Sequence, residues 1–136
     1  MAANPFPSPS VLALYRFRNL FNAVKSRLTE TRPDLTTNEV SLLLNLHRPR
    51  RIKDLARIMV CQPSNVTPLV NRCQERGWVA KKRSEQDART INVELSEPGI
   101  ALRNELVTEI EKHILDISGI SSESFDAILK LMPEEI

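Results

Sequence analysis

Apolar residues in the first third of the chain recur at intervals of three and four positions, as they do on one side of an α-helix. Ser10 is a good N-cap for such a helix, and Pro33 stops it. We therefore predict a helix of about 20 residues whose stripe consists of Leu14, Phe17, Phe21, Val24 and Leu28. Three alternating prolines in residues 1–10 predict an extended arm before it.

Two shorter helices are predicted next. Thr36 and Glu39 have the spacing of a capping box, in which each side chain accepts a hydrogen bond from the backbone N–H of the other residue. The helix that they begin must end before Pro49, and its apolar residues are Val40, Leu43, Leu44 and Leu46. A third helix follows, with a packed side formed by Leu55, Ala56 and Met59.

A fourth helix begins at Pro63, after a turn at about Cys61–Gln62, and is closed by Gly77. One face is apolar and contains Val66, Leu69, Val70 and Cys73. The other face carries Ser64, Asn65, Thr67, Pro68, Asn71 and Arg72. Small polar residues with one arginine suit a surface that approaches base edges, and they equally suit an ordinary solvated face. Pro68 removes a helical hydrogen bond, so we expect a local bend there.

Two short strands, Trp78–Arg83 and Thr90–Leu95, are predicted from their alternating residues. Those expected to face the core are Val79, Ile91, Val93 and Leu95, and those expected to face water are Lys82, Thr90, Asn92 and Glu94. The residues SEQDAR join the strands as a polar loop. Helix, turn, helix and hairpin in this order indicate a winged helix-turn-helix, whose second helix enters the DNA major groove.

Apolar stripes continue to the end of the chain. Ser96 is placed to cap a long helix that Gly119 ends, with a stripe of Leu102, Leu106, Ile110, Ile114 and Ile117. Ser121 or Ser122 begins a last short helix, closed by Pro133, with Phe125, Ile128, Leu129 and Met132 on its apolar side. These stripes need an apolar partner, and the first helix carries a matching one. The predicted fold class is mainly α with a small β-hairpin wing (α+β).

Charge is distributed unevenly along a chain whose net charge is only +2. Residues 48–90 hold eleven Lys and Arg against four Asp and Glu, whereas residues 91–136 hold three against ten. A basic segment with a helix-turn-helix pattern is an electrostatic footprint for phosphates. A solvated face balanced by the acidic half would have the same composition, so the pattern of residues, rather than charge alone, favours DNA.

Several classes of protein are not supported by the sequence. The chain has no apolar run of about 18 residues and no basic-then-apolar leader, so neither a membrane span nor a signal peptide is predicted. Two cysteines without metal-ligand spacing suit a reducing cytoplasm and no structural zinc. His47 and His113 are expected to be surface or packed residues rather than metal ligands. Without a nucleophile–base pattern or a glycine-rich phosphate loop, neither an enzyme nor a cofactor is predicted.

The sequence also resembles the MarR family of bacterial transcriptional regulators. PSNVTPLVNRCQERGWV is similar to that family's recognition helix, its closing Arg-Gly pair and the start of its first wing strand. SEQDARTINVELSEPG is similar to its wing, with the Asp-x-Arg signature at Asp87 and Arg89, and to the start of the next helix. The resemblance covers roughly residues 10–132 and is most specific from Ile52 to Gly99.

The resemblance implies a single domain over residues 1–136. A winged helix-turn-helix lobe would span about residues 36–95, and dimerisation helices about residues 10–30 and 97–132. In this family these helices intertwine across a two-fold axis, so that two recognition helices meet half-sites of a pseudo-palindromic operator about one DNA turn apart. Packing within one chain is the alternative for these helices.

The function that the resemblance implies is sequence-specific regulation of transcription, as a repressor released by a small aromatic or phenolic effector. The residues expected to contact DNA are Pro63, Ser64, Asn65, Thr67, Pro68, Arg72 and Arg89, and Asp87 would structure the wing. At Pro68 this chain departs from the family, which commonly has a basic or polar side chain there.

Other interpretations of the same residues stay open. A winged-helix module that binds protein instead of DNA would have the same fold, but the basic residues 48–90 favour DNA. Arg89 could form a surface ion pair worth less than about 1 kcal/mol. Cys61 lies near the positive end of the recognition helix, which would stabilise a thiolate, although a buried inert thiol is the favoured interpretation. The reactive cysteine that some MarR-like proteins carry near the start of the first helix is absent here, so that redox route is not expected.

Overall fold

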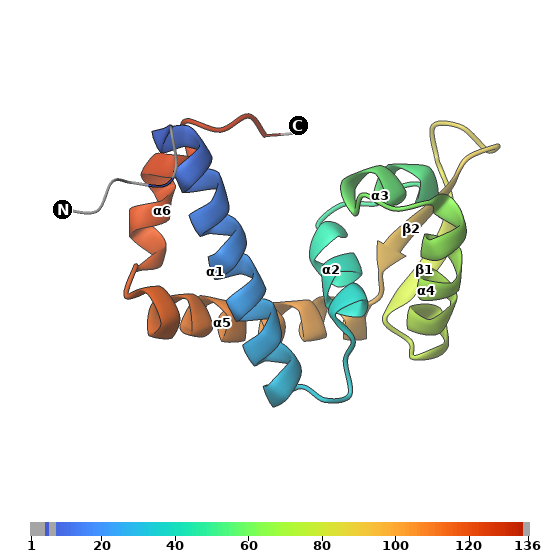
Figure 1. Ribbon diagram of the computed structural model, residues 1–136. Coiled ribbons are helices and arrows are strands. Elements are labelled where there is room, and N and C mark those ends of the chain that lie inside the picture. The colour runs from blue at the N-terminus through green and yellow to red at the C-terminus, as the bar shows by residue number, and fades with distance from the viewer. Residues whose placement is uncertain (1–4, 6–7, 135–136) are drawn as a thin grey trace. The chain divides into compact units, whose positions relative to one another are not determined.

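The computed structural model describes residue 5 and residues 8–134. Two compact units form within it, one from Pro33–Val107 and the other from Met1–Arg32 with Thr108–Ile136. The elements (Figure 1) are α1 (Pro9–Thr31), α2 (Thr37–Asn45), α3 (Ile52–Ile58), α4 (Pro63–Glu75), β1 (Val79–Arg83), β2 (Ile91–Leu95), α5 (Glu97–Ser118) and α6 (Ser122–Leu129). The predicted fold class, mainly helical with a two-stranded hairpin, is confirmed.

The core of the Pro33–Val107 unit is built from the apolar faces of α2, α3 and α4 with the hairpin. The predicted capping box begins α2: the Thr36 hydroxyl accepts the Glu39 N–H at 3.1 Å, and the Glu39 carboxylate accepts the Thr36 N–H at 3.1 Å. The largest fully buried side chains of this core include Leu42, Leu43, Leu55, Val66, Val70 and Val93. Burial of each such side chain contributes about 1.5–3 kcal/mol.

The hairpin is antiparallel, and a segment before α3 extends it. Arg50 and Val93 exchange backbone hydrogen bonds of 3.0 and 2.7 Å in an isolated bridge. Val79 and Val93 are buried as predicted, but the prediction that Ile91 faces the core is wrong, because its side chain is 50% exposed. Ile91 pairs with Arg83 at the end of the ladder next to the wing loop, beyond the reach of the core.

The start of α5 is fixed against the turn that follows α4. Ser96 caps α5 as predicted, since its hydroxyl accepts the Gly99 N–H at 3.1 Å. The same residue donates its N–H to the Trp78 carbonyl at 2.9 Å and its hydroxyl to the Gly77 carbonyl. A Cβ atom at Gly99 would overlap the Trp78 carbonyl oxygen, so this close approach requires glycine.

Helices α1 and α6 and the second half of α5 form the other unit. The first helix begins at Pro9, with Ser8 in an extended conformation before it, so the prediction of Ser10 as N-cap is wrong by two residues. Proline fits the first turn because a helix leaves that N–H unpaired. Of the predicted arm, residues 1–4 and 6–7 lie outside the described residues. Gly119 ends α5 with a φ of +71°.

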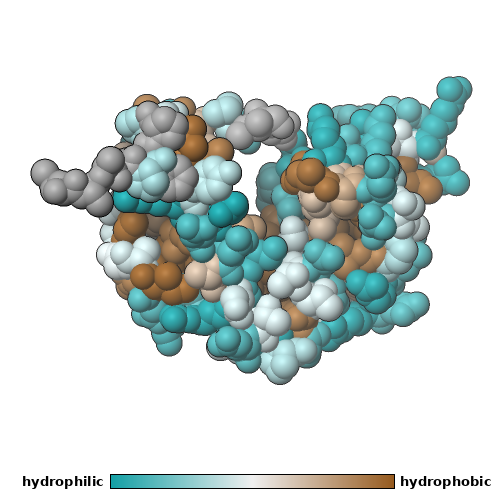
Figure 2. All heavy atoms as spheres, in the orientation of Figure 1, coloured by the Kyte–Doolittle hydropathy of each residue, from teal (hydrophilic) through white to brown (hydrophobic). Residues whose placement is uncertain are grey.

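Much of the apolar surface of this second unit is exposed to solvent. Along the α1 stripe Val24 and Leu28 are buried, whereas Leu14 and Phe21 are 67% and 61% exposed. Figure 2 shows apolar atoms at the surface of this part of the chain. A largely apolar cavity of about 690 Å³ opens between α1, the end of α5 and α6. No helix of the described chain has the length and hydropathy that crossing a membrane requires.

The turn between α3 and α4 contains a residue in a strained conformation. Val60 has a φ of +54° and is the one non-glycine residue with positive φ in the described chain. A β-branched residue is disfavoured in this left-handed region because its Cβ substituents crowd the backbone. Its side chain is 90% exposed, so no burial offsets the cost.

We expect Val60→Asn to raise the free energy of unfolding by about 1 kcal/mol, because asparagine adopts positive φ more readily. Urea denaturation of the purified protein would measure the change. Val60→Thr is the matched control, since it keeps the β-branch and should give no gain. A decrease on Val60→Asn would show that the turn is not strained by its side chain.

Candidate nucleic-acid interface

Helix α4 presents two chemically distinct faces. The apolar face is buried, with Val66, Val70 and Cys73 at 0% exposure and Leu69 at 4%. The residues predicted on the opposite face, Ser64, Asn65, Thr67, Pro68, Asn71 and Arg72, are all exposed, and so is Pro63 at the first turn. The apolar contacts therefore fix how the helix is rotated about its axis and leave the polar face open to solvent.

Helix α4 is continuous across its two prolines. Pro63 occupies the first turn, where its missing N–H costs nothing, and the helix continues through Pro68 to Glu75. The Thr67 hydroxyl donates to the Pro63 carbonyl at 3.2 Å. Within the described residues, the side chains of Asn65 and Arg72 make no hydrogen bond to the protein. They are open to an external partner.

The wing loop is closed by its own polar groups. One Asp87 carboxylate oxygen accepts the Arg89 N–H at 3.0 Å, and the other accepts the Thr90 hydroxyl at 3.4 Å. Arg83 donates to the Ala88 carbonyl at 2.7 Å. The side chain of Arg89 is exposed at the loop and makes no hydrogen bond within the described part of the chain.

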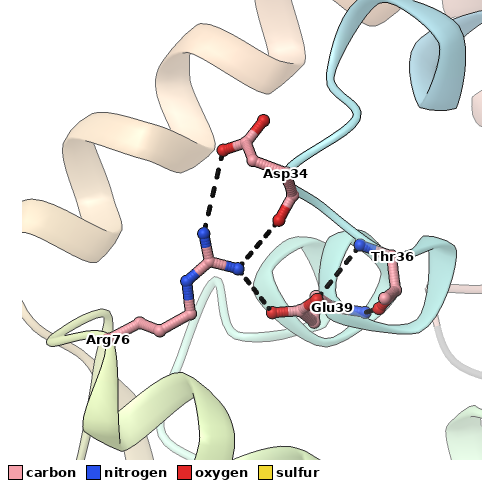
Figure 3. Close-up of polar contacts among 4 residues, drawn as sticks. All are labelled: Asp34, Thr36, Glu39 and Arg76. Carbon is pink, nitrogen blue, oxygen red and sulfur yellow. Dashed lines mark hydrogen bonds and ion pairs between the residues drawn. The ribbon is translucent and has the colours of Figure 1, made fainter.

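A charged network joins the C-terminal end of α4 to the beginning of α2 (Figure 3). The Arg76 guanidinium donates to the Glu39 carboxylate at 3.2 Å and to the Asp34 carbonyl at 2.9 Å, and it lies 3.8 Å from the Asp34 carboxylate. It also stacks over the Trp78 ring at 3.9 Å. The Glu39 side chain is only 5% exposed, so Arg76 supplies the charge partner of a buried carboxylate.

The sequence pattern indicated Arg76 only as part of the Arg-Gly pair that closes the helix, and not as the partner of Glu39. The capping box alone does not indicate that Glu39 is buried, so no local pattern predicted that it pairs with a cation. Arg76 lies 37 positions after Glu39 in the sequence, so the pairing of the two depends on the tertiary fold.

The thiol of Cys73, on the buried face of α4, is not expected to react as a thiolate. Burial, with a smaller contribution from Glu39, raises the pKa of the Cys73 thiol to about 11. Cys73 therefore stays protonated at neutral pH. Cys61 is half-buried rather than fully buried, and neither cysteine forms a disulfide. Among the described residues no cluster of His, Cys, Asp and Glu could hold a metal ion.

Comparison with known proteins identifies relatives among transcriptional regulators. Residues 25–106 match the family model described as transcriptional regulator SarA/Rot. An organic hydroperoxide resistance transcriptional regulator of Bacillus subtilis is 33% identical over 82 residues, which are 60% of this chain and 55% of that protein. The regulator SarZ of Staphylococcus haemolyticus is 24% identical over 105 residues, 76% of this chain and 71% of that protein. This chain thus matches only about half of the Bacillus regulator.

Solved structures share the fold over nearly the whole chain. A multiple antibiotic resistance repressor, MarR, superimposes with a TM-score of 0.78 at 15% identity, covering 96% of this chain and 99% of that one. A MarR family protein from Bacillus stearothermophilus gives a TM-score of 0.67 at 21% identity, covering 96% and 93%. At these identities the likeness concerns the fold.

Arg76→Gln should lower the free energy of unfolding by about 2 kcal/mol, because it leaves the buried Glu39 carboxylate without its cation. Urea denaturation would measure this loss, and Lys130→Gln, which breaks an exposed i,i+4 ion pair with Asp126, is the control expected to cost less than about 0.5 kcal/mol. The double variant Arg76→Gln/Glu39→Gln should cost less than the sum of its two single variants. If Arg76→Gln and the control lower the free energy of unfolding equally, the Arg76–Glu39 ion pair is no stronger than an exposed surface pair.

Proposed function

This chain belongs to the MarR family of winged-helix transcriptional regulators, and from that premise we propose that it is a homodimeric repressor that binds a pseudo-palindromic operator. The observation that carries the proposal is the exposed polar face of α4, beside a basic hairpin. On this face Asn71 accepts a hydrogen bond from Lys81, whereas the side chains of Asn65 and Arg72 make none within the described residues. The apolar face of the helix is buried in the core. Such a helix fits the major groove, where donors and acceptors of the bases distinguish sequences.

In this proposal the first turns of α4 read the sequence. Ser64, Asn65 and Thr67 lie there, between the two prolines Pro63 and Pro68. The Asn65 amide both donates and accepts, so it can match adenine in a bidentate way. The Thr67 hydroxyl already donates to the Pro63 carbonyl, so it would contribute mainly as an acceptor.

Two arginines would make contacts that do not depend on sequence. Arg72 lies about two turns after Asn65 on α4, where a long cation reaches a phosphate. Arg89, on the loop that Asp87 structures, would contact a phosphate or enter the minor groove. A protein-binding winged-helix module is the second candidate, and a salt-dependent DNA-binding assay separates it from the first.

The dimer is proposed from the exposed apolar residues of α1 and α6. Leu14 and Phe21 on α1 and Leu129 on α6 are each more than 60% exposed, and the apolar cavity lies between these two helices. Exposed apolar area of this kind is typical of protein interfaces. A second copy would cover it and place two recognition helices on one operator.

Repression is proposed from the names of the relatives, and its release by an effector from the resemblance to the MarR family. One related structure is named a repressor, and the Bacillus relative is named for hydroperoxide resistance. We propose that this chain likewise represses its target genes in the cytoplasm and that a small aromatic or phenolic molecule releases it from DNA.

Asn65→Ala should cost about 1–3 kcal/mol on the operator and much less on random DNA, because it removes a base-specific contact. Arg72→Ala should weaken both by similar factors. The operator would first be selected from a random pool of duplexes, and affinities would then be measured by fluorescence anisotropy. If Asn65→Ala lowers the affinity for operator and random DNA equally, with folding intact, this turn does not read the bases.

Sedimentation equilibrium should give twice the 15.5 kDa mass of one chain at micromolar concentration. Phe21→Glu should lower the mass toward one chain, because it places a charge in the proposed interface. Ile91→Glu, at an exposed apolar position on the wing, is the control that should leave the mass unchanged. A wild-type monomer that still binds the palindrome tightly would contradict the dimer.

A further inference from the structure

The side-chain amide of Asn71 on α4 is held by a lysine of the hairpin. Lys81 Nζ donates a hydrogen bond of 2.7 Å to Asn71 Oδ1, and both side chains are exposed. Because an ammonium group can only donate, the amide atom that faces it must be the oxygen. The contact therefore determines which way the Asn71 amide is turned.

The geometry of β1 directs Lys81 toward α4 and its neighbour Lys82 away from it. Lys81 is on the same face of the strand as Val79 and pairs with Val93, and both valines are buried in the core that α4 helps to form. Lys82 is on the opposite face, where its ammonium group lies 2.7 Å from the Glu94 carboxylate. Within the described residues Lys81 has no carboxylate partner. Its charge is therefore not neutralised by an ion pair.

The hydrogen bond from Lys81 leaves Asn71 mainly as a donor. The amide oxygen faces a cation, whereas the NH₂ group has no partner within the described part of the chain. An asparagine that reads adenine uses both halves of its amide, because N6–H needs an acceptor and N7 needs a donor. Guanine presents two acceptors in the major groove, N7 and O6. The cation beside the amide oxygen disfavours the N6–H donor of adenine, so the pair matches guanine better.

The position of Asn71 on α4 suits a contact with bases beyond the first turns. Asn71 follows Ser64 by seven residues, so the two side chains project from the same side of the helix, about 10 Å apart along its axis. A helix that lies along the groove would carry this side past about three further base pairs, at about 3.4 Å each. The adjacent Arg72 is rotated about 100° from that side, toward the flank for which a phosphate contact is proposed above.

We propose that Asn71 is a specificity-determining residue that reads guanine in each half-site, and that Lys81 is the positioning residue that keeps the Asn71 amide turned as a donor. This inference rests on the proposed function, since it requires α4 to lie in the major groove. It adds a point of base readout about two turns beyond Ser64. It also gives strand β1 a part in the choice of sequence.

The first experiment selects bound duplexes from a random pool. Wild-type protein should select guanine at one position of each half-site, and Asn71→Ala should lose that preference while keeping the rest of the operator. Lys81→Met removes the cation but keeps a long side chain, so adenine should replace guanine at the same position. Lys82→Met is the matched control, because it removes the neighbouring lysine, whose partner is Glu94. It should leave the selected sequence unchanged.

Fluorescence anisotropy then measures affinity for the selected operator and for a copy in which A·T replaces G·C at that position of one half-site. Wild-type protein should bind the operator about tenfold more tightly than the copy. Lys81→Met should bind the copy more tightly than the operator. If Lys81→Met instead weakens binding to both duplexes by the same factor, Lys81 contacts a phosphate and its positioning role is overturned.

The failure of this inference is distinguishable from the failure of the proposed function. If Asn71→Ala selects the same sequence as wild-type protein, the inference is overturned while the proposed function stands. If wild-type protein selects no common sequence, both are overturned. Because both side chains are exposed, Asn71→Ala and Lys81→Met should unfold at the same urea concentration as wild-type protein.

The second experiment tests the hydrogen bond without DNA. It follows the side-chain NH₂ signals of Asn71 in nitrogen-15 correlated NMR spectra of the free protein. These signals should shift in Lys81→Met, which removes the cation from the amide oxygen, and stay in place in Lys82→Met. If they stay in place in both variants, Lys81 does not hold the amide and its positioning role is overturned.

Discussion

The ion pair between Arg76 and Glu39 joins the end of α4 to the first turn of α2, and the position of the recognition helix depends on it. Apolar packing holds the buried face of the helix against the core, and the ion pair adds a specific contact at its C-terminal end. The Arg76 guanidinium also donates a hydrogen bond to the Asp34 carbonyl and stacks on the Trp78 ring. These two contacts further restrict where the C-terminal end of α4 can lie. Because a buried carboxylate without a cation is costly, alternative placements of the helix that separate the pair are disfavoured.

Short-range patterns accounted for most of the fold. The capping box at Thr36, the buried face of α4 and the glycine that closes it follow from spacings of three to five residues, and local chemistry is sufficient for each. The exposure of the candidate DNA-contacting residues could be predicted for the same reason, since a helix with one apolar face has only one way to bury it. The roles of those residues on DNA remain predictions.

Features that depend on distant segments could not be predicted. The partners of Arg76 lie 37 and 42 residues away in the sequence, so they meet only when the chain folds. Alternation in β2 suggested that Ile91 is buried, but the core ends before the ladder does. At the start of α1, the proline that suggested an extended arm is the residue best suited to begin a helix.

The polar contacts that hold α4 are concentrated at its C-terminal end, so a tilt about that end moves the N-terminal end most. Arg76 and the Gly77 carbonyl, which Ser96 binds, anchor its C-terminal end, while Asn65 lies near the opposite end. Thirteen residues at about 1.5 Å each make an arm of about 20 Å, so a tilt of about 10° at the anchor displaces the first turn by about 3 Å. A bidentate contact to a base does not survive such a displacement, whereas long arginine side chains can follow a phosphate. A tilt of about 10° would thus suffice to separate selective from unselective binding.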